Sequence, residues 1–317
     1  MGAQSKIEWT DASWNPIRAR RLFAEGDVIV WGRSSTKQHG LGWHCEHISE
    51  GCRNCYAETM NRRLGTGLDF KPGHLDDIEI FLDEKMLLAP FHWRKPRRIF
   101  VCSMTDLFGA WVKYEWLDRI FAVMALCPQH TFQVLTKRPK QMRGYLSIGR
   151  ANPVGLEALG IVMSEARINP RSDVGAGVML QGDIPHLKVW PLPNVWLGVS
   201  CEDQATYDRR KDDLRATPAA IHFFSIEPML GPINADLLAD WVICGGESGH
   251  GARPMHPDWA RSLRNQCAAA GVPFFLKQWG EYLPRGTPPE IGSGYDRVGK
   301  KRAGHLLDGR EHNEFPT

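Results

Sequence analysis

The stretch Val195-Trp-Leu-Gly-Val-Ser-Cys-Glu202 has the pattern that decides the fold class: an apolar run followed at once by polar side chains. Five further short runs are apolar along nearly their whole length, namely residues 98–102, 131–135, 221–225, 241–244 and 272–276. A strand with one face in water alternates apolar and polar residues, whereas a strand covered on both faces is apolar throughout. The six runs therefore predict strands of a parallel sheet.

Amphipathic patterns with helical spacing separate these runs. Apolar residues recur three or four positions apart over residues 116–126, just before one predicted strand. Trp259, Leu263 and Cys267 show the same spacing before another, and Gly271 follows where a helix end favours glycine. Strands that alternate with helices are typical of βα units. The sequence thus predicts an α/β fold, a partial or complete (β/α) barrel with parallel strands and inserted loops.

The composition is typical of a soluble globular protein, because 43% of the 317 residues are hydrophobic and 24% are charged. These fractions exclude disordered, fibrous and disulfide-stapled miniprotein classes. No apolar run reaches the ~18 residues of a membrane span, and the N-terminus lacks the apolar core of a secretory signal. We therefore expect a cytoplasmic protein with no membrane partner. A net charge of +3 neither demands nor excludes nucleic acid.

One barrel domain is expected over residues 1–280, with residues 281–317 packed on it as an irregular C-terminal tail. Residues 17–44 and 143–193 interrupt the alternation of predicted strands and helices, so both are predicted to be insertions. The first has the character of a loop or small hairpin. The second is an excursion with a weak helical pattern near residues 156–167.

Segments that carry polar side chains follow the predicted strands directly, and their residues are candidates for a site. They are Ser103, Thr105 and Asp106, Lys137 and Arg138, Ser200 and Glu202, Glu227, Gly245, Gly246 and Glu247, and Lys277, Gln278 and Trp279. In parallel α/β folds the active site lies at the carboxyl ends of the strands. We therefore expect these residues to share one pocket. The alternative is that surface loops are simply polar.

Three cysteines form the sharpest local motif. Cys45, Cys52 and Cys55 have the spacing C-x6-C-x2-C, and Gly51 gives the backbone freedom to place the second sulfur. In a chain without an export signal, clustered thiols indicate metal binding or catalysis rather than disulfides. Three thiolates occupy three corners of a four-iron cube and leave the fourth iron open, which a catalytic site requires.

Two alternatives remain open for these cysteines at the level of sequence. A zinc ion could take the three thiolates together with His44 or His47. The thiols could also be packed without a ligand, since free cysteines are often buried. The other five cysteines lie in or beside apolar runs and are interpreted as core residues: Cys102, Cys127, Cys201, Cys244 and Cys267.

Further motifs run along nearly the whole chain and carry a resemblance. They are IEWTD (7–11), WNP (14–16), GCRNCYAE (51–58), SMTDLF (103–108), LTKRP (135–139), WLGVS (196–200), EP (227–228), GGESG (245–249), ARPM (252–255) and FFLKQWG (274–280). Together they resemble the three-Cys-motif family (phage Gp37/Gp68-like, DUF5131), a divergent branch of the radical S-adenosylmethionine (SAM) superfamily. The resemblance implies a barrel of radical SAM type.

The chain departs from the family pattern at two points. Residues 17–44 separate the WNP motif from the first cysteine, where the family usually has only a few residues. The wider superfamily places an aromatic residue just before the third cysteine, and here Asn54 stands there with Tyr56 on the other side. Tyr56 is therefore the residue that we expect to contact the adenine of SAM.

The resemblance implies a [4Fe–4S] cluster on Cys45, Cys52 and Cys55, with SAM bound at the open iron. An electron donor such as flavodoxin or ferredoxin would reduce the cluster. SAM would then be cleaved to a 5′-deoxyadenosyl radical that abstracts hydrogen from a substrate. The alternative function is that of a non-enzymatic, phage-associated binding protein with structural zinc at the same cysteines.

The resemblance also suggests roles for the residues at the strand ends. The candidates for SAM binding are Tyr56, Ser103, Thr105, Asp106, Lys137, Ser200, Glu202, Gly245 and Gly246. The candidates for substrate binding are Trp9, Asp11, Arg138, Arg253, Gln278 and Trp279, and the catalytic candidates are Glu227, Glu247 and Lys277. For each of them, a structural ion pair or a packing role is the alternative.

The substrate is the least determined part of the prediction. DNA or a nucleotide is one hypothesis, because basic stretches that could contact phosphates occur at residues 18–21, 62–63, 94–98 and 300–302. Such charge runs are more often solvated faces. Residues 8–15 are expected to form a first strand and its exit. The tryptophans there could stack on a base, plug the floor of the barrel or pack the inserted loop.

Overall fold

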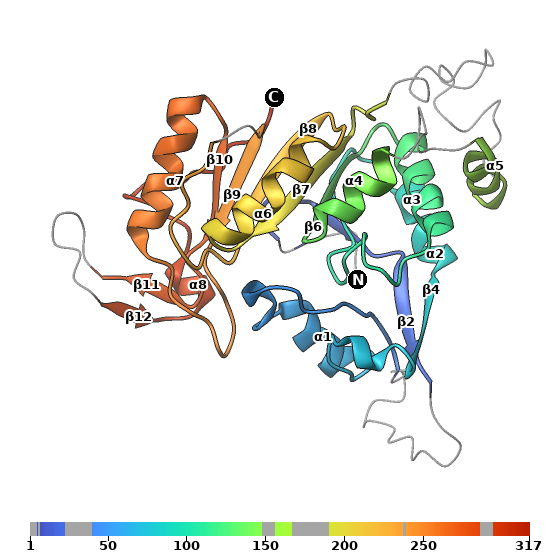
Figure 1. Cartoon of the computed structure of the whole chain (residues 1–317), viewed down its shortest axis with the longest axis horizontal. Coiled ribbons are helices and arrows are strands. Elements are labelled where there is room, and N and C mark those ends of the chain that lie inside the picture. The colour runs from blue at the N-terminus through green and yellow to red at the C-terminus, as the bar shows by residue number, and fades with distance from the viewer. Residues whose placement is uncertain are drawn as a thin grey trace.

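A computed structural model describes residues 5, 7–22, 40–147, 156–166, 190–236, 239–285 and 294–317. Its centre is a seven-stranded parallel sheet with the order β1-β5-β6-β7-β8-β9-β10 (Figure 1). The strands are β1 Ala12–Trp14, β5 Arg98–Val101, β6 Thr131–Thr136, β7 Val195–Cys201, β8 Ile221–Ile226, β9 Trp241–Gly245 and β10 Phe274–Gln278. The sheet curls into a half-barrel, with β1 and β10 at its ends.

The six strands predicted from apolar runs are confirmed, and every neighbouring pair is parallel. The α/β class and the partial barrel follow from this arrangement. The sheet has one further strand, β1, which begins at Ala12, after Trp9. Trp9 therefore lies ahead of the first strand rather than in it.

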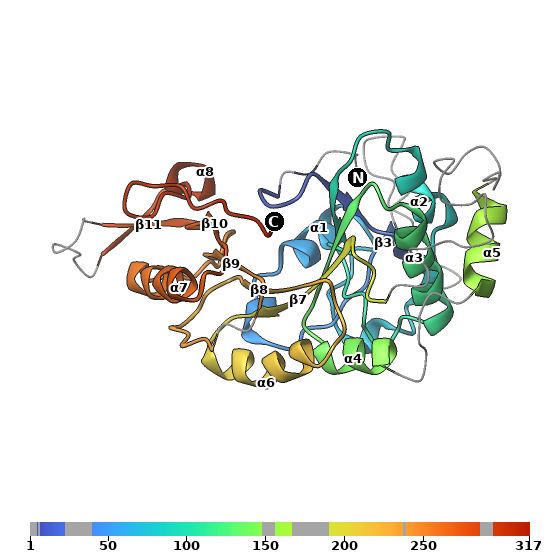
Figure 2. The ribbon, with the colours of Figure 1, turned by 90° about the horizontal axis from the view of Figure 1, so that it is seen from above.

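Helices cover the outer face of the half-barrel (Figure 2). They are α3 Tyr114–Leu126, α4 Pro139–Ser147, α6 Gln204–Arg215 and α7 Pro257–Ala270, with α5 Leu156–Glu165 packed on α3. Tyr207 of α6 lies over β8, with its ring 4.8 Å from that of Phe224. Gly271 ends α7 with φ of 68°, which confirms the predicted left-handed cap. Most buried apolar side chains lie in the layer between these helices and the sheet.

A small antiparallel sheet stands beside the half-barrel, with the order β3-β2-β4. Its strands are β2 Ile17–Arg21, β3 Leu41–Gly42 and β4 Ile78–Leu82. The two ends of the first predicted insertion therefore pair with each other, and residues 23–39 lie outside the described residues. The insertion 143–193 is described only in part, and the weak helix predicted in it corresponds to α5.

The segment after Gly280 contains regular structure where an irregular tail was expected. β11 Tyr282–Pro284 pairs with β12 Tyr295–Arg297, and α8 Lys300–Ala303 follows. Backbone hydrogen bonds hold this segment in a regular conformation, because Val298 N and Gly299 N both donate to Glu281 O. The last residues then return to β10, where Leu276 N donates to His312 O.

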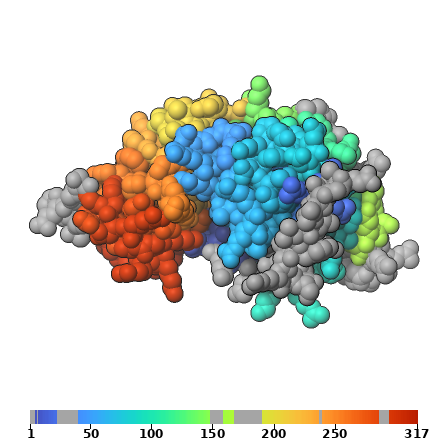
Figure 3. Space-filling view, turned by 90° about the horizontal axis from the view of Figure 1, so that it is seen from below, coloured from blue at the N-terminus to red at the C-terminus, as the bar shows by residue number. Residues whose placement is uncertain are grey.

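The remaining short elements connect the two sheets. They are η1 Glu50–Cys52, α1 Tyr56–Leu64, η2 Pro72–His74, α2 Glu84–Leu87 and η3 Ala89–His92. Residues 45–55, which carry the three cysteines, are called the cysteine loop. Seen from below, this loop and α1 cover the middle of the molecule, beside the C-terminal residues (Figure 3). Among the helices described, none has the length and apolar character that a bilayer crossing needs.

Candidate functional site

The concave side of the half-barrel is filled with aromatic rings near the amino ends of its strands. Trp9 is 1% exposed, and its ring centroid lies 4.7 Å from that of Phe100 on β5. It lies 6.3 Å from Trp241 on β9 and 6.4 Å from Phe223 on β8. Because Trp9 touches strands from both arms of the curled sheet, it closes this half of the barrel as a floor.

Above this floor, toward the carboxyl ends, small residues leave space. Ser200 and Ser225 line a cavity of about 450 Å³ together with Gly246. A Cβ at Gly246 would come within 2.0 Å of the carbonyl oxygen of Trp279, so only glycine fits there. A half-barrel with an aromatic floor and small residues above it thus forms a pocket at the edge where parallel sheets carry their sites.

A β-bulge in β10 brings two consecutive side chains into this cavity. Leu276 pairs with Cys244 and Gln278 with Gly245, which leaves Lys277 as the extra residue. In a regular strand Lys277 and Gln278 would point to opposite faces, but here both line the cavity. Glu227 Oε1 accepts hydrogen bonds from Lys277 Nζ at 2.6 Å and from Gln278 Nε2 at 3.2 Å.

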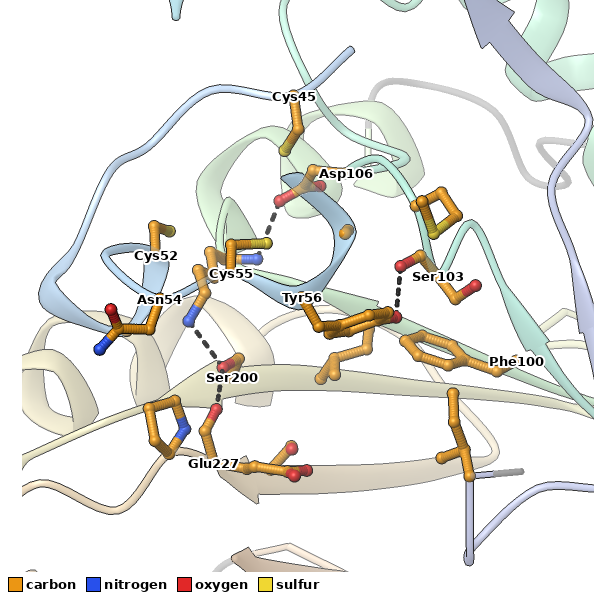
Figure 4. Close-up of a pocket in the computed structure, with 18 of the residues that line it drawn as sticks. Cys45, Cys52, Asn54, Cys55, Tyr56, Phe100, Ser103, Asp106, Ser200 and Glu227 are labelled. Carbon is orange, nitrogen blue, oxygen red and sulfur yellow. Dashed lines mark hydrogen bonds between the residues drawn. The ribbon is translucent and has the colours of Figure 1, made fainter. Parts of the chain in front are cut away.

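The three cysteines line the opposite wall of the same cavity (Figure 4). Cys52 ends η1, Cys55 caps α1, and none of the three forms a disulfide. Cys45 and Cys55 pack against a small apolar cluster that contains Phe70 and Met104. Burial raises the pKa of Cys45 to about 12 and also raises the pKa of Cys55, so both thiols are protonated without a metal.

Three free thiols from one loop are a donor set that a four-iron cluster can use. Within the described ranges, no three His, Cys, Asp or Glu side chains converge on one point where a metal ion could be held. The two histidines of the zinc alternative face carboxylates: His44 Nε2 lies 3.8 Å from Glu46, and His47 Nε2 lies 3.3 Å from Glu58. Zinc needs thiolates at about 2.3 Å from one centre, whereas a four-iron cube takes each thiolate at a separate corner.

Buried Glu202 holds the cysteine loop in place from beneath. Its Oε1 accepts from Ser49 Oγ at 2.8 Å and pairs with Lys137, and its Oε2 lies 3.2 Å from Arg210 Nη1. A Cβ at Gly51 would come within 2.5 Å of the same carboxylate. Burial by itself would raise the pKa of Glu202, but the two cations outweigh it and hold this pKa below its usual value.

A second ion pair ties the strand ends to the loop. Asp106 accepts from Thr136 Oγ1 at 2.6 Å and from Arg138 Nη1 at 3.1 Å. The guanidinium of Arg138 also donates to Glu46 O and lies over the Trp111 ring. Asp106 and Arg138 are both more than nine-tenths buried, so this pair is a fixed part of the wall.

A third contact joins the loop to the segment after β9. Arg253 donates to Glu247 Oε1 at 2.7 Å and to Glu50 Oε2 at 3.1 Å. Beside it, Asn54 Nδ2 donates to Gly251 O at 2.7 Å. Burial opposes the ionisation of Glu247, but Arg253 more than offsets it and lowers the pKa of this carboxyl. The cysteine loop is therefore clasped from two sides.

Comparison with known families gives one match over this architecture. A family model described as a protein of unknown function (DUF5131) matches residues 29–316, which include the three cysteines and the strands β5 to β10. The chain belongs to the DUF5131 family. Comparison with curated proteins and comparison with solved structures each found no match. The family part of the resemblance is thereby confirmed.

The cavity of this DUF5131 protein brings together most of the predicted site residues. Those that line it are Trp9, Cys45, Cys52, Cys55, Tyr56, Ser103, Thr105, Asp106, Lys137, Arg138, Ser200, Glu227, Gly246, Glu247, Lys277 and Gln278. Tyr56 follows Cys55 directly at the start of α1, and its hydroxyl donates to Ser103 O at 2.6 Å (Figure 4). Eight separate segments of the chain thus meet at one place.

Five predicted residues of the DUF5131 protein do not line the cavity. Asp11 lies before β1, at the amino ends of the strands, where its carboxylate accepts from the backbone and guanidinium of Arg98. The indole of Trp279 is buried and donates to Leu306 O. Glu202 and Arg253 lie behind the cavity lining and support the cysteine loop instead, and Gly245 lies beneath Glu227.

Other lining residues were not predicted as site residues. Ser225 lies in β8, two positions before Glu227, which directly follows that strand, so the alternation of side chains could have identified it. Phe100 looked like a core residue, because an apolar residue within a strand gives no sign that its ring borders a cavity. Lys300 comes from the C-terminal segment and pairs with Glu8 at 3.1 Å, a contact that no local pattern indicates.

Proposed function

We propose that this protein is a radical SAM enzyme that binds a [4Fe–4S] cluster through Cys45, Cys52 and Cys55 and abstracts hydrogen from a substrate. The observation that carries the proposal is the position of three free thiols from one loop over an open cavity at the carboxyl edge of a parallel half-barrel. When bound, the cluster supplies the electron that cleaves SAM and generates the hydrogen-abstracting radical.

The walls of the cavity suit the charges of SAM. Its ammonium needs acceptors, and the backbone around Ser103 provides them, because both Asp106 oxygens already accept from Thr136 and Arg138. Its carboxylate needs a cation, and Lys137 Nζ stands between Ser200 Oγ, at 2.8 Å, and Glu202. At Gly246 the missing side chain allows a ligand ring to approach the backbone closely.

We assign substrate chemistry to the wall of the cavity that faces the cysteines. Glu227 and Lys277 form an ion pair of 2.6 Å, and both side chains keep some contact with the cavity. Such a pair can hold a polar group of the substrate or move a proton between the two side chains. Both carboxylate oxygens of Glu247 accept hydrogen bonds from the Arg253 guanidinium. We therefore favour Glu227 and Lys277 over Glu247 as the catalytic pair.

Anaerobic reconstitution with iron and sulfide tests the proposal. We expect about four irons per chain, a brown colour and release of 5′-deoxyadenosine that depends on a reductant. Cys52→Ala should abolish iron binding, and Cys267→Ala, a buried thiol on α7, should leave it unchanged. Iron binding without any SAM cleavage would refute the enzymatic proposal.

Metal analysis of the same samples separates the alternative function. A structural zinc site predicts a colourless protein that holds about one zinc and unfolds with a chelator. The radical SAM proposal predicts that a chelator removes iron while the far-ultraviolet circular dichroism stays the same. A flavodoxin or ferredoxin should replace the chemical reductant in the SAM cleavage assay.

A further inference from the structure

Exposed apolar side chains gather beside the cysteines. Of the ten large apolar side chains that are exposed among the described residues, four lie within residues 48–64: Ile48, Tyr56, Met60 and Leu64. The last three are spaced four apart on α1, so they form a row on one face of the helix, the α1 ridge. Their exposed fractions are 51%, 36% and 45%. Single exposed apolar residues are ordinary, whereas a contiguous apolar patch is a feature of interaction sites.

The surface around the α1 ridge is positively charged. The acidic residue of α1, Glu58, is buried, whereas Arg62 and Arg63 are both exposed. Arg62 pairs with Glu58 and Asp69, but Arg63 has no carboxylate within ion-pair distance among the described residues. Arg53, in the cysteine loop just before α1, is also exposed and has no such partner in the described ranges. Unpaired cations on a surface attract a negatively charged partner.

The residue types of this surface fit a protein better than a nucleic acid. Tyr, Met and Arg are enriched in the cores of protein interfaces. Nucleic acid is held mainly by cations on its phosphates, and Met60 and Leu64 add nothing to such contacts. A second copy of this chain would bring its own arginines against Arg63, and like charges repel. The surface is therefore suited to an acidic protein.

The position of the α1 ridge indicates what this partner supplies. Tyr56 follows Cys55 directly and lines the cavity, so the ridge begins at one of the three cysteines. A substrate must reach Glu227 and Lys277 on the wall that faces the cysteines, whereas a protein on α1 meets the cysteine side first (Figure 4). A row of three side chains is a small patch, as in transient electron-transfer complexes, which bury less than about 1,200 Å².

We propose that the α1 ridge, with Arg53 and Arg63 beside it, docks an acidic one-electron carrier protein that reduces the cluster. One electron leaves the reduced flavin or iron–sulfur centre of the carrier and enters the oxidised cluster, and no atom is transferred. The electron transfer rests on the proposed function, whereas the binding of the carrier to α1 does not.

Two acidic electron carriers, an oxidised flavodoxin and an oxidised [2Fe–2S] ferredoxin, are the probes for this surface. Each is titrated into the reconstituted full-length protein. We expect at least one carrier to bind, and its affinity to fall about tenfold as the salt rises from about 50 to about 300 mM, because exposed charges are screened. An affinity that does not depend on salt would contradict the role of the arginines.

Leu64→Glu and Arg63→Glu place negative charge on or beside the ridge, so each should weaken carrier binding about fivefold or more. Ile161→Glu and Arg209→Glu are the matched controls, because they make the corresponding changes at exposed positions of α5 and α6. These helices belong to the outer layer, away from the cysteines, so both controls should bind as the wild type does (Figure 2). Equal affinity in all four variants, or no binding of either carrier, would contradict the proposal.

A DNA duplex of about 20 base pairs tests the other class of partner. We expect the carrier to bind unchanged in the presence of this duplex. If the duplex displaces the carrier, and Leu64→Glu and Arg63→Glu weaken its own binding, the face binds nucleic acid and the docking proposal is wrong.

SAM cleavage separates this inference from the proposed function. With a chemical reductant, Leu64→Glu and Arg63→Glu should cleave SAM at the wild-type rate, whereas the KM for a reduced carrier should rise about fivefold or more. If the carrier binds to α1 but no reductant yields SAM cleavage, the docking surface stands and the proposed function fails. If SAM is cleaved but both variants keep the wild-type affinity and KM for the carrier, the docking proposal fails and the proposed function stands.

Discussion

At the scale of single residues, Gly51 and Glu202 show how a buried carboxylate can position the loop that carries the cysteines. The carboxylate is fully buried, and it joins Ser49 of the loop to Lys137 and Arg210 of the barrel. Its negative charge is stabilised by two cations, so it can act as a rigid support. The glycine is required because any side chain at position 51 would meet that carboxylate.

Gly51→Ala should therefore displace the loop that carries Cys52. We expect the iron content after reconstitution to fall by at least half, because a Cβ would stand 2.5 Å from the Glu202 carboxylate. Gly73→Ala is the control, since a Cβ there meets no atom within 4 Å. Iron content per chain and the melting temperature are the measurements. Full iron loading in Gly51→Ala would show that the loop adjusts and that this contact is not needed.

His130 should make the stability depend on pH below neutrality. Burial lowers the pKa of His130, whereas the Pro90 carbonyl opposes this shift. Below the usual histidine pKa of about 6.5, the unfolded chain takes up the proton and the folded chain does not. The contribution of neutral, buried His130 to the free energy of unfolding is complete above about pH 6.5. It is lost as the pH falls, by up to about 1.4 kcal/mol per pH unit.

Urea unfolding at pH 7.5 and pH 5.5 measures this effect in the wild type and in His130→Asn. The loss of unfolding free energy on acidification should be smaller in the variant, which lacks the buried imidazole. His250→Asn, a change at an exposed position, should retain the wild-type loss. Identical losses in the wild type and His130→Asn would rule out His130 as the source.

At the scale of elements, the cysteine loop with α1 forms one side of the cavity and the strand ends form the other. Arg253 joins the two by contacts to Glu247 after β9 and to Glu50 in η1. It also donates to the Glu50 carbonyl at 2.9 Å. Removing this side chain would leave the sheet intact but would release one end of the loop.

Arg253→Ala should thus accelerate the loss of iron from the reconstituted protein to a chelator by about tenfold, with little change in circular dichroism. The physical reason is that local opening of a loop becomes more frequent when its anchoring contacts are removed. Arg285→Ala breaks an exposed pair with Asp296 outside the cavity and should leave the rate unchanged. Equal rates in the two variants would show that Arg253 does not restrain the loop.

At the scale of the whole molecule, stability and chemistry reside in different layers. The core between the sheet and the outer helices is apolar and closely packed, whereas the cysteines lie on the inner side of the half-barrel. The layer that stabilises the fold is therefore independent of the residues that would bind the cluster.

Cys52→Ala should consequently change the free energy of unfolding by less than about 1 kcal/mol in the metal-free protein. Phe132→Ala, which removes a fully buried ring from the outer layer, should cost about 3–5 kcal/mol. Denaturant titration of the two variants measures both values. Global unfolding of Cys52→Ala would indicate that the cysteines are structural and would favour the zinc alternative.

The sequence by itself determined the six strands, the helix capped by Gly271, the spacing of the cysteines and the gathering of polar residues at the strand ends. These features depend on periodicity and local conformation, which neighbouring residues set. The parallel arrangement followed because continuously apolar strands need cover on both faces. Most of the residues expected at the site line one cavity for this reason.

Only the tertiary structure decided which side chains border the cavity and which support it. The bulge that turns both Lys277 and Gln278 inward depends on the register between β9 and β10. Ser49 meets Glu202 across 153 positions of sequence, and Trp9 closes the floor only because the sheet curls around it. Such contacts arise from packing between distant segments, and no local pattern of residues encodes them.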